Sequence, residues 1–122
     1  AQALRKDAGR LDFLIGRSTH SLVQAQDAER DGADYIAIGP VFQTPTKPTY
    51  EPVGLELLRR VTSLVRTPHV VIGGIDSTNV AQVLAAGARR VAVVRAVCGK
   101  RDVREAARHL KQMMEQQEGV RA

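Results

Sequence analysis

The sequence predicts an α/β fold in which four βα units form the C-terminal half of a TIM (β/α)8 barrel. Short apolar runs alternate with segments of helical periodicity, a pattern typical of a parallel sheet covered by helices. The predicted strands end near Gly16, Gly39, Gly73 and Arg95, at spacings of 23, 34 and 22 residues. Four units of this size make half of a barrel of ~250 residues. A small doubly wound sheet is the competing architecture, but the chain contains no Gly-x-Gly-x-x-Gly or P-loop sequence.

The first unit begins with an apolar strand at residues 13–16. Ser21 then caps a helix, with Gln24 three residues later as its capping-box partner, and Gly32 ends the helix. Helical spacing predicts that the inward-facing residues are Leu22, Ala25 and Ala28, with Val23 as a further candidate.

The second unit consists of a strand at residues 35–38, a long loop, and a helix over about residues 55–65. The loop accounts for the longest of the three spacings. The apolar residues that fall on one face of the helix are Leu55, Leu58, Val61 and Val65.

The last two units follow the same plan. A strand at 69–72 follows Pro68, and after Gly73-Gly74 either Asp76 or Ser77 caps a helix that ends at Gly87. The last strand covers residues 90–94. A final helix begins near Asp102, where Glu105 completes a capping box, and continues to about Gln116.

Composition restricts the kinds of partner. Cys98 is the single cysteine, which excludes an internal disulfide and favours a reducing, cytoplasmic location. No apolar run approaches the ~20 residues that a membrane span needs. The net charge of +5 suits anionic partners, but the basic residues are scattered and the aromatic content is 3%, which argues against nucleic-acid binding. Of the anionic partners that the charge suits, phosphates therefore remain the expected kind.

Polar residues and glycines follow each predicted strand, where parallel α/β folds collect their functional groups. The candidates in chain order are Ser18, Thr19 and His20, then Thr44, Thr46 and Lys47, then Gly73 and Gly74, and finally Arg95 and Ala96. Gly73-Gly74 before a helix favours phosphate binding, because backbone N–H groups and the helix N-terminus attract anions. Lys47 adds a point charge and the threonines add hydroxyl donors.

These residues also have structural interpretations, which stay open at this point. The stretch 39–47 could be a stiff proline-rich connector, and Gly73-Gly74 a tight turn without a ligand. His20 could be a general base, a phosphate donor or a helix-capping residue. Asp76 is the only acidic residue near the functional end, and helix capping accounts for it, so a metal site built from this chain alone is not expected.

Five motifs occur together and in order: the stretches 16–21 (Gly-Arg-Ser-Thr-His-Ser), 33–42, 44–47 (Thr-Pro-Thr-Lys), 71–75 and 91–94. With them, residues 11–110 closely resemble the C-terminal half of the thiamine-phosphate synthase family. The resemblance implies a TIM barrel that joins 4-amino-2-methyl-5-hydroxymethylpyrimidine pyrophosphate to thiazole phosphate. The products would be thiamine phosphate and pyrophosphate, and the displacement would be assisted by Mg²⁺.

The resemblance also implies residue roles. Ser18 and Lys47 would be catalytic residues that contact the pyrophosphate, and Thr44 and Thr46 would bind the thiazole phosphate or line its pocket. Gly74 and the backbone near Val94 would hold the thiazole phosphate. Arg95 stands where many family members have serine, which implies a variant phosphate grip.

The same resemblance implies that the N-terminal half of the barrel, with the Mg²⁺ ligands, is absent from residues 1–122. Four barrel strands leave two bare edges, so we expect either the missing half or a second copy of the chain as partner. We expect no synthase activity from these residues alone. The alternatives are a thiazole tautomerase-like isomerase that uses His20 for proton transfer, and a non-catalytic phosphate-binding half-barrel.

Overall fold

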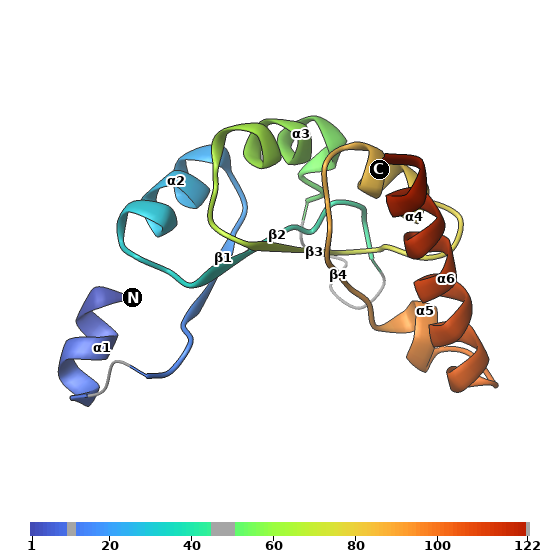
Figure 1. Ribbon diagram of the computed structural model, residues 1–122, viewed down its shortest axis with the longest axis horizontal. Helices are drawn as coiled ribbons and strands as arrows, with labels where there is room; N and C mark the ends of the chain where they lie inside the picture. The colour runs from blue at the N-terminus through green and yellow to red at the C-terminus, as the bar shows by residue number, and fades with distance from the viewer. Residues whose placement is uncertain (10–11, 45–50, 122) are drawn as a thin grey trace.

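The computed structural model describes residues 1–9, 12–44 and 51–121, with side chains through residue 117 (Figure 1). The elements in chain order are α1 (Gln2–Ala8), β1 (Gly16–Thr19), α2 (Leu22–Arg30), β2 (Tyr35–Ile38), α3 (Gly54–Leu64), β3 (His69–Ile72), α4 (Val80–Ala85), β4 (Val91–Ala92), α5 (Arg95–Cys98) and α6 (Val103–Arg121). Figure 1 shows an arch, with α2, α3 and α4 along its outer side and the strands beneath them.

The strands form one parallel sheet in the order β1-β2-β3-β4. Every strand therefore pairs with the next one in the chain, and each crossover passes through a helix on the outer side. This is the βα repeat that the sequence predicts, and the α/β fold with parallel strands is confirmed. The carboxyl ends of the strands consequently meet at one edge of the sheet.

Side chains alternate between the two faces of the sheet. On β2, Ile36 and Ile38 are buried beneath the helices, whereas Tyr35 is 41% exposed on the other face. On β3, Val71 is buried and Ile72 is 39% exposed. We call the exposed face the inner face, because it would line the interior of a closed barrel. The outer core is thus filled by the four units themselves, and the inner face is not.

Helices supply the rest of the outer core. The fully buried helical residues are Ala25 and Ala28 of α2, Leu58 and Val61 of α3, and Val80, Val83 and Leu84 of α4. Each fully buried Val or Leu side chain contributes about 1.5–3 kcal/mol of transfer free energy. Val23, a further candidate for the inward face, is 64% exposed, so that expectation is wrong.

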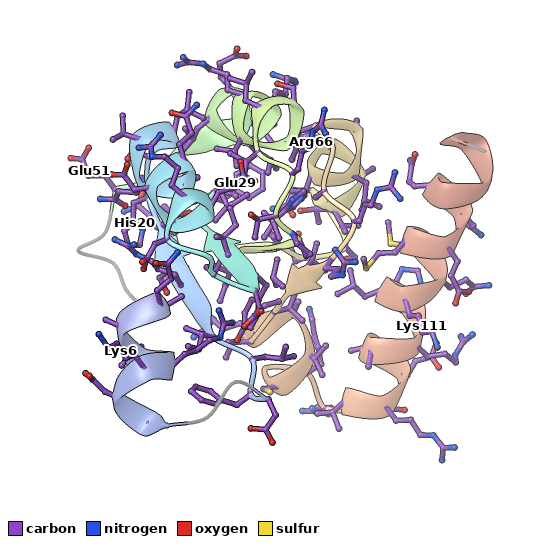
Figure 2. The ribbon with its side chains drawn as sticks, turned by 60° about the vertical axis from the view of Figure 1, so that its left-hand side comes forward. Lys6, His20, Glu29, Glu51, Arg66 and Lys111 are labelled. Atoms are coloured by element: carbon purple, nitrogen blue, oxygen red, sulfur yellow. The ribbon has the colours of Figure 1, made fainter. Side chains whose placement is uncertain are left out.

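Glu29 connects α2 to the segment between α3 and β3. One oxygen, Oε2, accepts hydrogen bonds from the backbone N–H groups of Arg66 at 2.7 Å and Thr67 at 2.8 Å, and from the Thr67 hydroxyl at 2.9 Å. These bonds, the Thr67 backbone N–H foremost, lower the pKa of Glu29. Figure 2 labels Glu29 and Arg66. The carboxylate thereby satisfies backbone donors that the end of α3 leaves unpaired.

The first strand lies three residues later than predicted. Phe13 and Leu14 precede it, and Leu14 is 77% exposed. Asp34 fixes the start, because its carboxylate accepts from the Ile15 N–H and its own N–H donates to the Ile15 carbonyl. Ser18 and Thr19 therefore belong to β1 rather than to the loop after it.

The other departures concern the second half of the chain. Helix α4 begins at Val80 with Asn79 as its N-cap residue, rather than Asp76 or Ser77 as predicted. A hydrogen-bonded turn of Asp76, Thr78 and Asn79 precedes it, and the Asp76 carbonyl accepts from the Val80 N–H at 2.9 Å. The Asp76 carboxylate accepts from both the N–H and the hydroxyl of Thr78, which lower its pKa. Strand β4 contains only two residues, and the short helix α5 was not predicted.

Helix α6 begins as predicted and ends later. The Asp102 carboxylate accepts from the Glu105 N–H at 2.9 Å, which confirms this N-cap, and the helix continues past Gln116 to Arg121. Of the helices in the described ranges, none is both long and apolar enough to cross a membrane.

Candidate functional site

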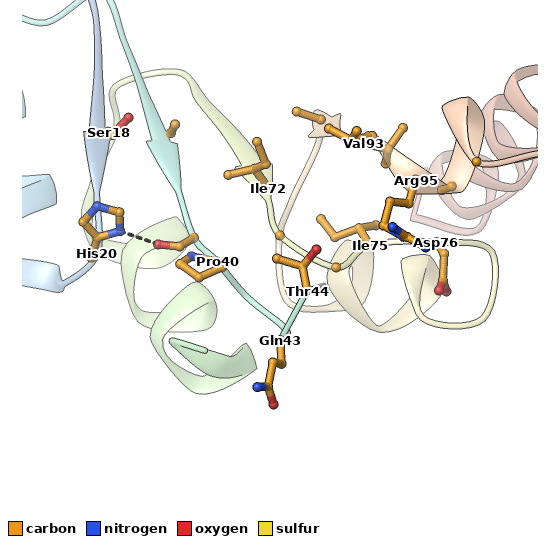
Figure 3. Close-up of a pocket in the computed structure, with 18 of the residues that line it drawn as sticks. Ser18, His20, Pro40, Gln43, Thr44, Ile72, Ile75, Asp76, Val93 and Arg95 are labelled. Carbon is orange, nitrogen blue, oxygen red and sulfur yellow. Dashed lines mark hydrogen bonds between the residues drawn. The ribbon is translucent and has the colours of Figure 1, made fainter. Parts of the chain in front are cut away.

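A cavity of about 590 Å³ lies at the carboxyl ends of all four strands (Figure 3). Its walls come from the end of β1, the loop after β2, the Gly73-Gly74 turn after β3, and α5 after β4. The structure therefore brings together predicted site residues that are far apart in the sequence. These are Ser18, His20, Thr44, Gly74, Val94 and Arg95. Thr46 and Lys47 lie outside the described residues.

Ser18 and Thr19 point to opposite faces of β1, although they are adjacent in the chain. Thr19 is buried on the outer side, and its hydroxyl donates to the carbonyl of Ala37 at 2.8 Å. Ser18 is exposed on the inner face, where it lines the cavity. Of these two hydroxyl residues, Ser18 is the one that presents its side chain to a ligand.

The loop after β2 is attached to the neighbouring strand ends by its backbone. The N–H of Val41 donates to the Ile72 carbonyl at 3.1 Å, and the N–H of Phe42 donates to the Gly73 carbonyl at 3.0 Å. In Figure 3, Thr44 points toward the middle of the cavity and Gln43 points away from it. These hydrogen bonds hold the first part of the loop in place, so that it forms a wall of the cavity and Thr44 lies within it.

Glycines permit this close approach of two loops. A side chain at Gly39 would overlap the Ile72 carbonyl, and one at Gly73 would overlap Pro40. At Gly74 a Cβ would lie 2.9 Å from the Gln43 carbonyl oxygen. Gly73 and Gly74 also have φ angles of 110° and 67°, which side chains rarely adopt. The double glycine is therefore required by loop–loop packing, whether or not it also receives phosphate.

His20 lies at the end of β1 and contacts the start of the loop after β2. Its Nδ1 is 2.6 Å from the Gly39 carbonyl oxygen, shown by the dashed line in Figure 3. A carbonyl only accepts, so Nδ1 carries the proton. The backbone N–H of His20 donates to Gln24 Oε1 at 2.7 Å, while the Gln24 N–H donates to the Ser21 hydroxyl at 3.1 Å. The Ser21 cap with Gln24 as partner is confirmed, with the glutamine reaching His20 rather than Ser21 itself.

The wall after β4 carries positive charge. Arg95 is the first residue of α5 and exposed, and Val94 before it is 52% exposed. Lys100 also lines the cavity, although the sequence analysis did not predict it as a site residue. Lys100 reaches the cavity because α5 turns the chain back toward it. No local sequence pattern predicted so short a helix. Two cationic side chains thus stand beside one carboxylate, that of Asp76.

The arrangement suits an anionic ligand better than a metal ion. Among residues with described positions, no group of three or more His, Cys, Asp and Glu side chains is close enough to hold a metal. The Asp76 carboxylate already accepts two hydrogen bonds from Thr78. Hydroxyl and cationic donors around an apolar floor that includes Ile72 and Ala92 can bind a phosphorylated organic molecule.

The sequence comparisons with known proteins point to one family. Residues 3–97 match the family model described as thiamine monophosphate synthase. A thiamine-phosphate synthase of Gloeobacter violaceus is 52% identical over 90 residues, which cover 74% of this chain and 26% of that protein. One of Methanocella arvoryzae is 50% identical over 105 residues, covering 85% and 50% respectively.

One solved structure agrees with the sequence comparisons. The structure of a thiamine phosphate pyrophosphorylase from Pyrococcus furiosus superposes with a TM-score of 0.83 at 39% identity. It covers 95% of this chain, whereas this chain covers 55% of it. The chain therefore spans about a quarter to a half of the relatives it matches.

Proposed function

Because the chain belongs to the thiamine monophosphate synthase family, we propose that it forms one side of a synthase active site. The reaction condenses 4-amino-2-methyl-5-hydroxymethylpyrimidine pyrophosphate with thiazole phosphate, and it yields thiamine phosphate and pyrophosphate. The observation that carries this proposal is the cavity at the strand ends, where Ser18, Thr44, Gly74 and Arg95 meet.

Each residue has a role suited to its position. Ser18 donates its hydroxyl to the pyrophosphate from the inner face of β1. Thr44 binds the thiazole phosphate, which rests against Gly74 and the backbone at Val94, and Arg95 supplies its counter-charge. Thr46 and Lys47 are assigned by motif: Thr46 to the thiazole substrate and Lys47 to the departing pyrophosphate.

Charge stabilisation is the main contribution of this chain. As the bond from the methylene carbon on the pyrimidine ring to the pyrophosphate oxygen breaks, negative charge grows on the leaving group. Lys47 and Ser18 stabilise that charge, and a preorganised donor of this kind contributes roughly 10²–10³ in rate. Thr44 and Arg95 hold the thiazole phosphate so that its ring nitrogen faces the methylene carbon from which the pyrophosphate departs.

Magnesium is the metal that the family implies, but the residues described here do not fit it. Among the described residues that line the cavity, Asp76 supplies the one carboxylate, and its Oδ1 already accepts two hydrogen bonds from Thr78. We therefore assign the Mg²⁺ ligands to the other half of the barrel and derive no step through the metal. A cytoplasmic location completes the proposal, consistent with the single cysteine.

The partner of this chain is the N-terminal half-barrel. Strands β1 and β4 are the edges of the described sheet, and Tyr35, Ile72 and Val94 are exposed on or beside its inner face. Four further βα units would pair both edges and cover these apolar side chains. Residues 1–122 alone are accordingly inactive.

A fusion protein tests this proposal. We would join the N-terminal half of the Pyrococcus furiosus relative to this chain, and call the product the fused barrel. Given both substrates and Mg²⁺, the fused barrel should form thiamine phosphate, and the 122-residue chain should not. A fused barrel that folds with native-like circular dichroism but forms no thiamine phosphate would refute the synthase role.

The same assay separates the alternatives. A tautomerase would convert the thiazole substrate when the pyrimidine pyrophosphate is omitted, and His20 lines the cavity where such a proton transfer would occur. A non-catalytic half-barrel would bind inorganic phosphate and turn over neither substrate.

A further inference from the structure

We propose that His20 is a positioning residue: its Nδ1–H holds the Gly39 carbonyl and thereby fixes the loop that carries Thr44 into the cavity. The kinetic consequences of this inference rest on the proposed function, whereas its structural basis is independent of that function. The central observation is the 2.6 Å hydrogen bond between the imidazole and the Gly39 carbonyl oxygen.

This bond replaces a sheet hydrogen bond at the point where β1 leaves the sheet. The last register pair of β1 and β2 is Thr19 with Ile38, and the Gly39 N–H still donates to the Thr19 carbonyl at 3.3 Å. In a continued parallel ladder the next donor to the Gly39 carbonyl would be the N–H of Ser21, but Ser21 is the N-cap of α2, where the chain leaves the sheet. The imidazole then supplies the donor for the Gly39 carbonyl, so the two chains stay attached one residue beyond the ladder.

Gly39 is held on its other side by β3. Its Cα packs so closely on Ile72 that any side chain would overlap the Ile72 carbonyl, and the following N–H groups of Val41 and Phe42 bond to the Ile72 and Gly73 carbonyls. The peptide after Gly39 is thus fixed from β1 by His20 and from β3 by the backbone. Releasing the His20 side lets this peptide rotate, and Thr44 lies only five residues further on.

A residue that replaces His20 must provide a hydrogen-bond donor at the position of Nδ1. Asparagine places its Nδ2 where histidine has Nδ1, so His20→Asn keeps a donor for the Gly39 carbonyl. Glutamine reaches the position of Nε2 instead, and alanine offers no donor. An acid–base role at Nε2 would favour neither amide, because neither exchanges protons near neutral pH.

The kinetic test compares these three variants in the fused barrel. His20→Ala and His20→Gln should raise the KM for thiazole phosphate about tenfold, a loss of the size of one hydrogen bond, with kcat within about threefold of the unsubstituted protein. His20→Asn should keep both constants within about threefold. The matched control is His109→Asn, because His109 is exposed on α6 and outside the strand-end cavity.

Amide hydrogen exchange on the 122-residue chain gives a second readout that needs no turnover. Exchange at the Val41 and Phe42 amides should accelerate about tenfold in His20→Ala and His20→Gln, and remain unchanged in His20→Asn and His109→Asn. If the fused barrel is inactive without any substitution, the synthase proposal fails while this comparison still decides the role of His20.

Two results would overturn the positioning role. Loss of kcat in His20→Asn as large as in His20→Ala would make His20 an acid–base catalyst. If the amide exchange at Val41 and Phe42 and the KM for thiazole phosphate were unchanged in all three variants, the contact between His20 and Gly39 would not hold the loop in place.

Discussion

Glu29→Ala removes the carboxylate that joins α2 to the start of β3, and it should be among the more destabilising surface substitutions in the chain. Glu29 Oε2 accepts three hydrogen bonds, two of them from the backbone N–H groups of Arg66 and Thr67. Hydrogen bonds to a charged group contribute about 1.5–3 kcal/mol, and they do not add fully when they share one oxygen. Because Glu29 is half-buried and water can reach part of this site, we expect a loss of about 2 kcal/mol.

The pH dependence provides an independent test of the same interaction. The hydrogen bonds from Thr67 and Arg66 lower the pKa of Glu29 in the folded chain. The stabilisation is therefore fully present above the unfolded-state value of 4.5, and it is lost as the pH falls through the lower folded-state pKa. Glu29→Gln should lack this acid-dependent component, because its amide does not titrate.

Urea unfolding followed by circular dichroism, at pH 7 and at several lower pH values, measures both effects. The matched control is Glu56→Ala on α3, where an exposed carboxylate pairs with Arg59 at 3.3 Å and should contribute less than about 0.5 kcal/mol. If Glu29→Ala were no more destabilising than Glu56→Ala, or if Glu29→Gln kept the acid-dependent loss of stability, our account of this contact would be wrong.

Three further substitutions test other parts of the structure. Gly73→Ala should cost about 2 kcal/mol in urea unfolding, because its φ is 110° and the new Cβ would overlap Pro40; stability within 0.5 kcal/mol of the unsubstituted chain would contradict that contact. Ile36→Ala should cost about 2–5 kcal/mol in the same assay, whereas Val23→Ala on the exposed face of α2 should change stability by less than about 0.5 kcal/mol; similar losses for the two would place the core wrongly. Arg95→Ala should raise the KM for thiazole phosphate in the fused barrel about tenfold, with Arg59→Ala as the control, and an unchanged KM would remove Arg95 from the phosphate grip.

The sequence predicted the elements whose boundaries depend on local chemistry. Pro68 and the glycine pair bracket β3, and its bounds agree with the structure residue for residue. The Ser21 cap was equally clear. The position of β1 was not, because apolar character at Phe13 and Leu14 does not reveal that Asp34 fixes the strand start from 19 residues away.

The candidate site could be predicted in outline but not in its construction. Strand-end logic placed Ser18, Thr44, Gly74 and Arg95 near one another, and all four line the cavity. What local patterns could not show is how the loops contact one another. The imidazole of His20 on the Gly39 carbonyl is a contact across 19 residues, and Lys100 enters the cavity only because α5 reverses the chain.

The alternation of side chains along the strands also determines what a survey of mutations would detect. In the 122-residue chain, stability reports on outer residues such as Ile36 and Val71, which are buried beneath helices. Their neighbours Tyr35 and Ile72 are partly exposed on the inner face, so substitutions there would cost less stability. In a closed barrel both sets would be constrained. One set of stability measurements would be made on the 122-residue chain and a second set on a closed barrel. Comparing the two sets would identify the strand residues whose side chains contribute to stability only when the other half of the barrel is present.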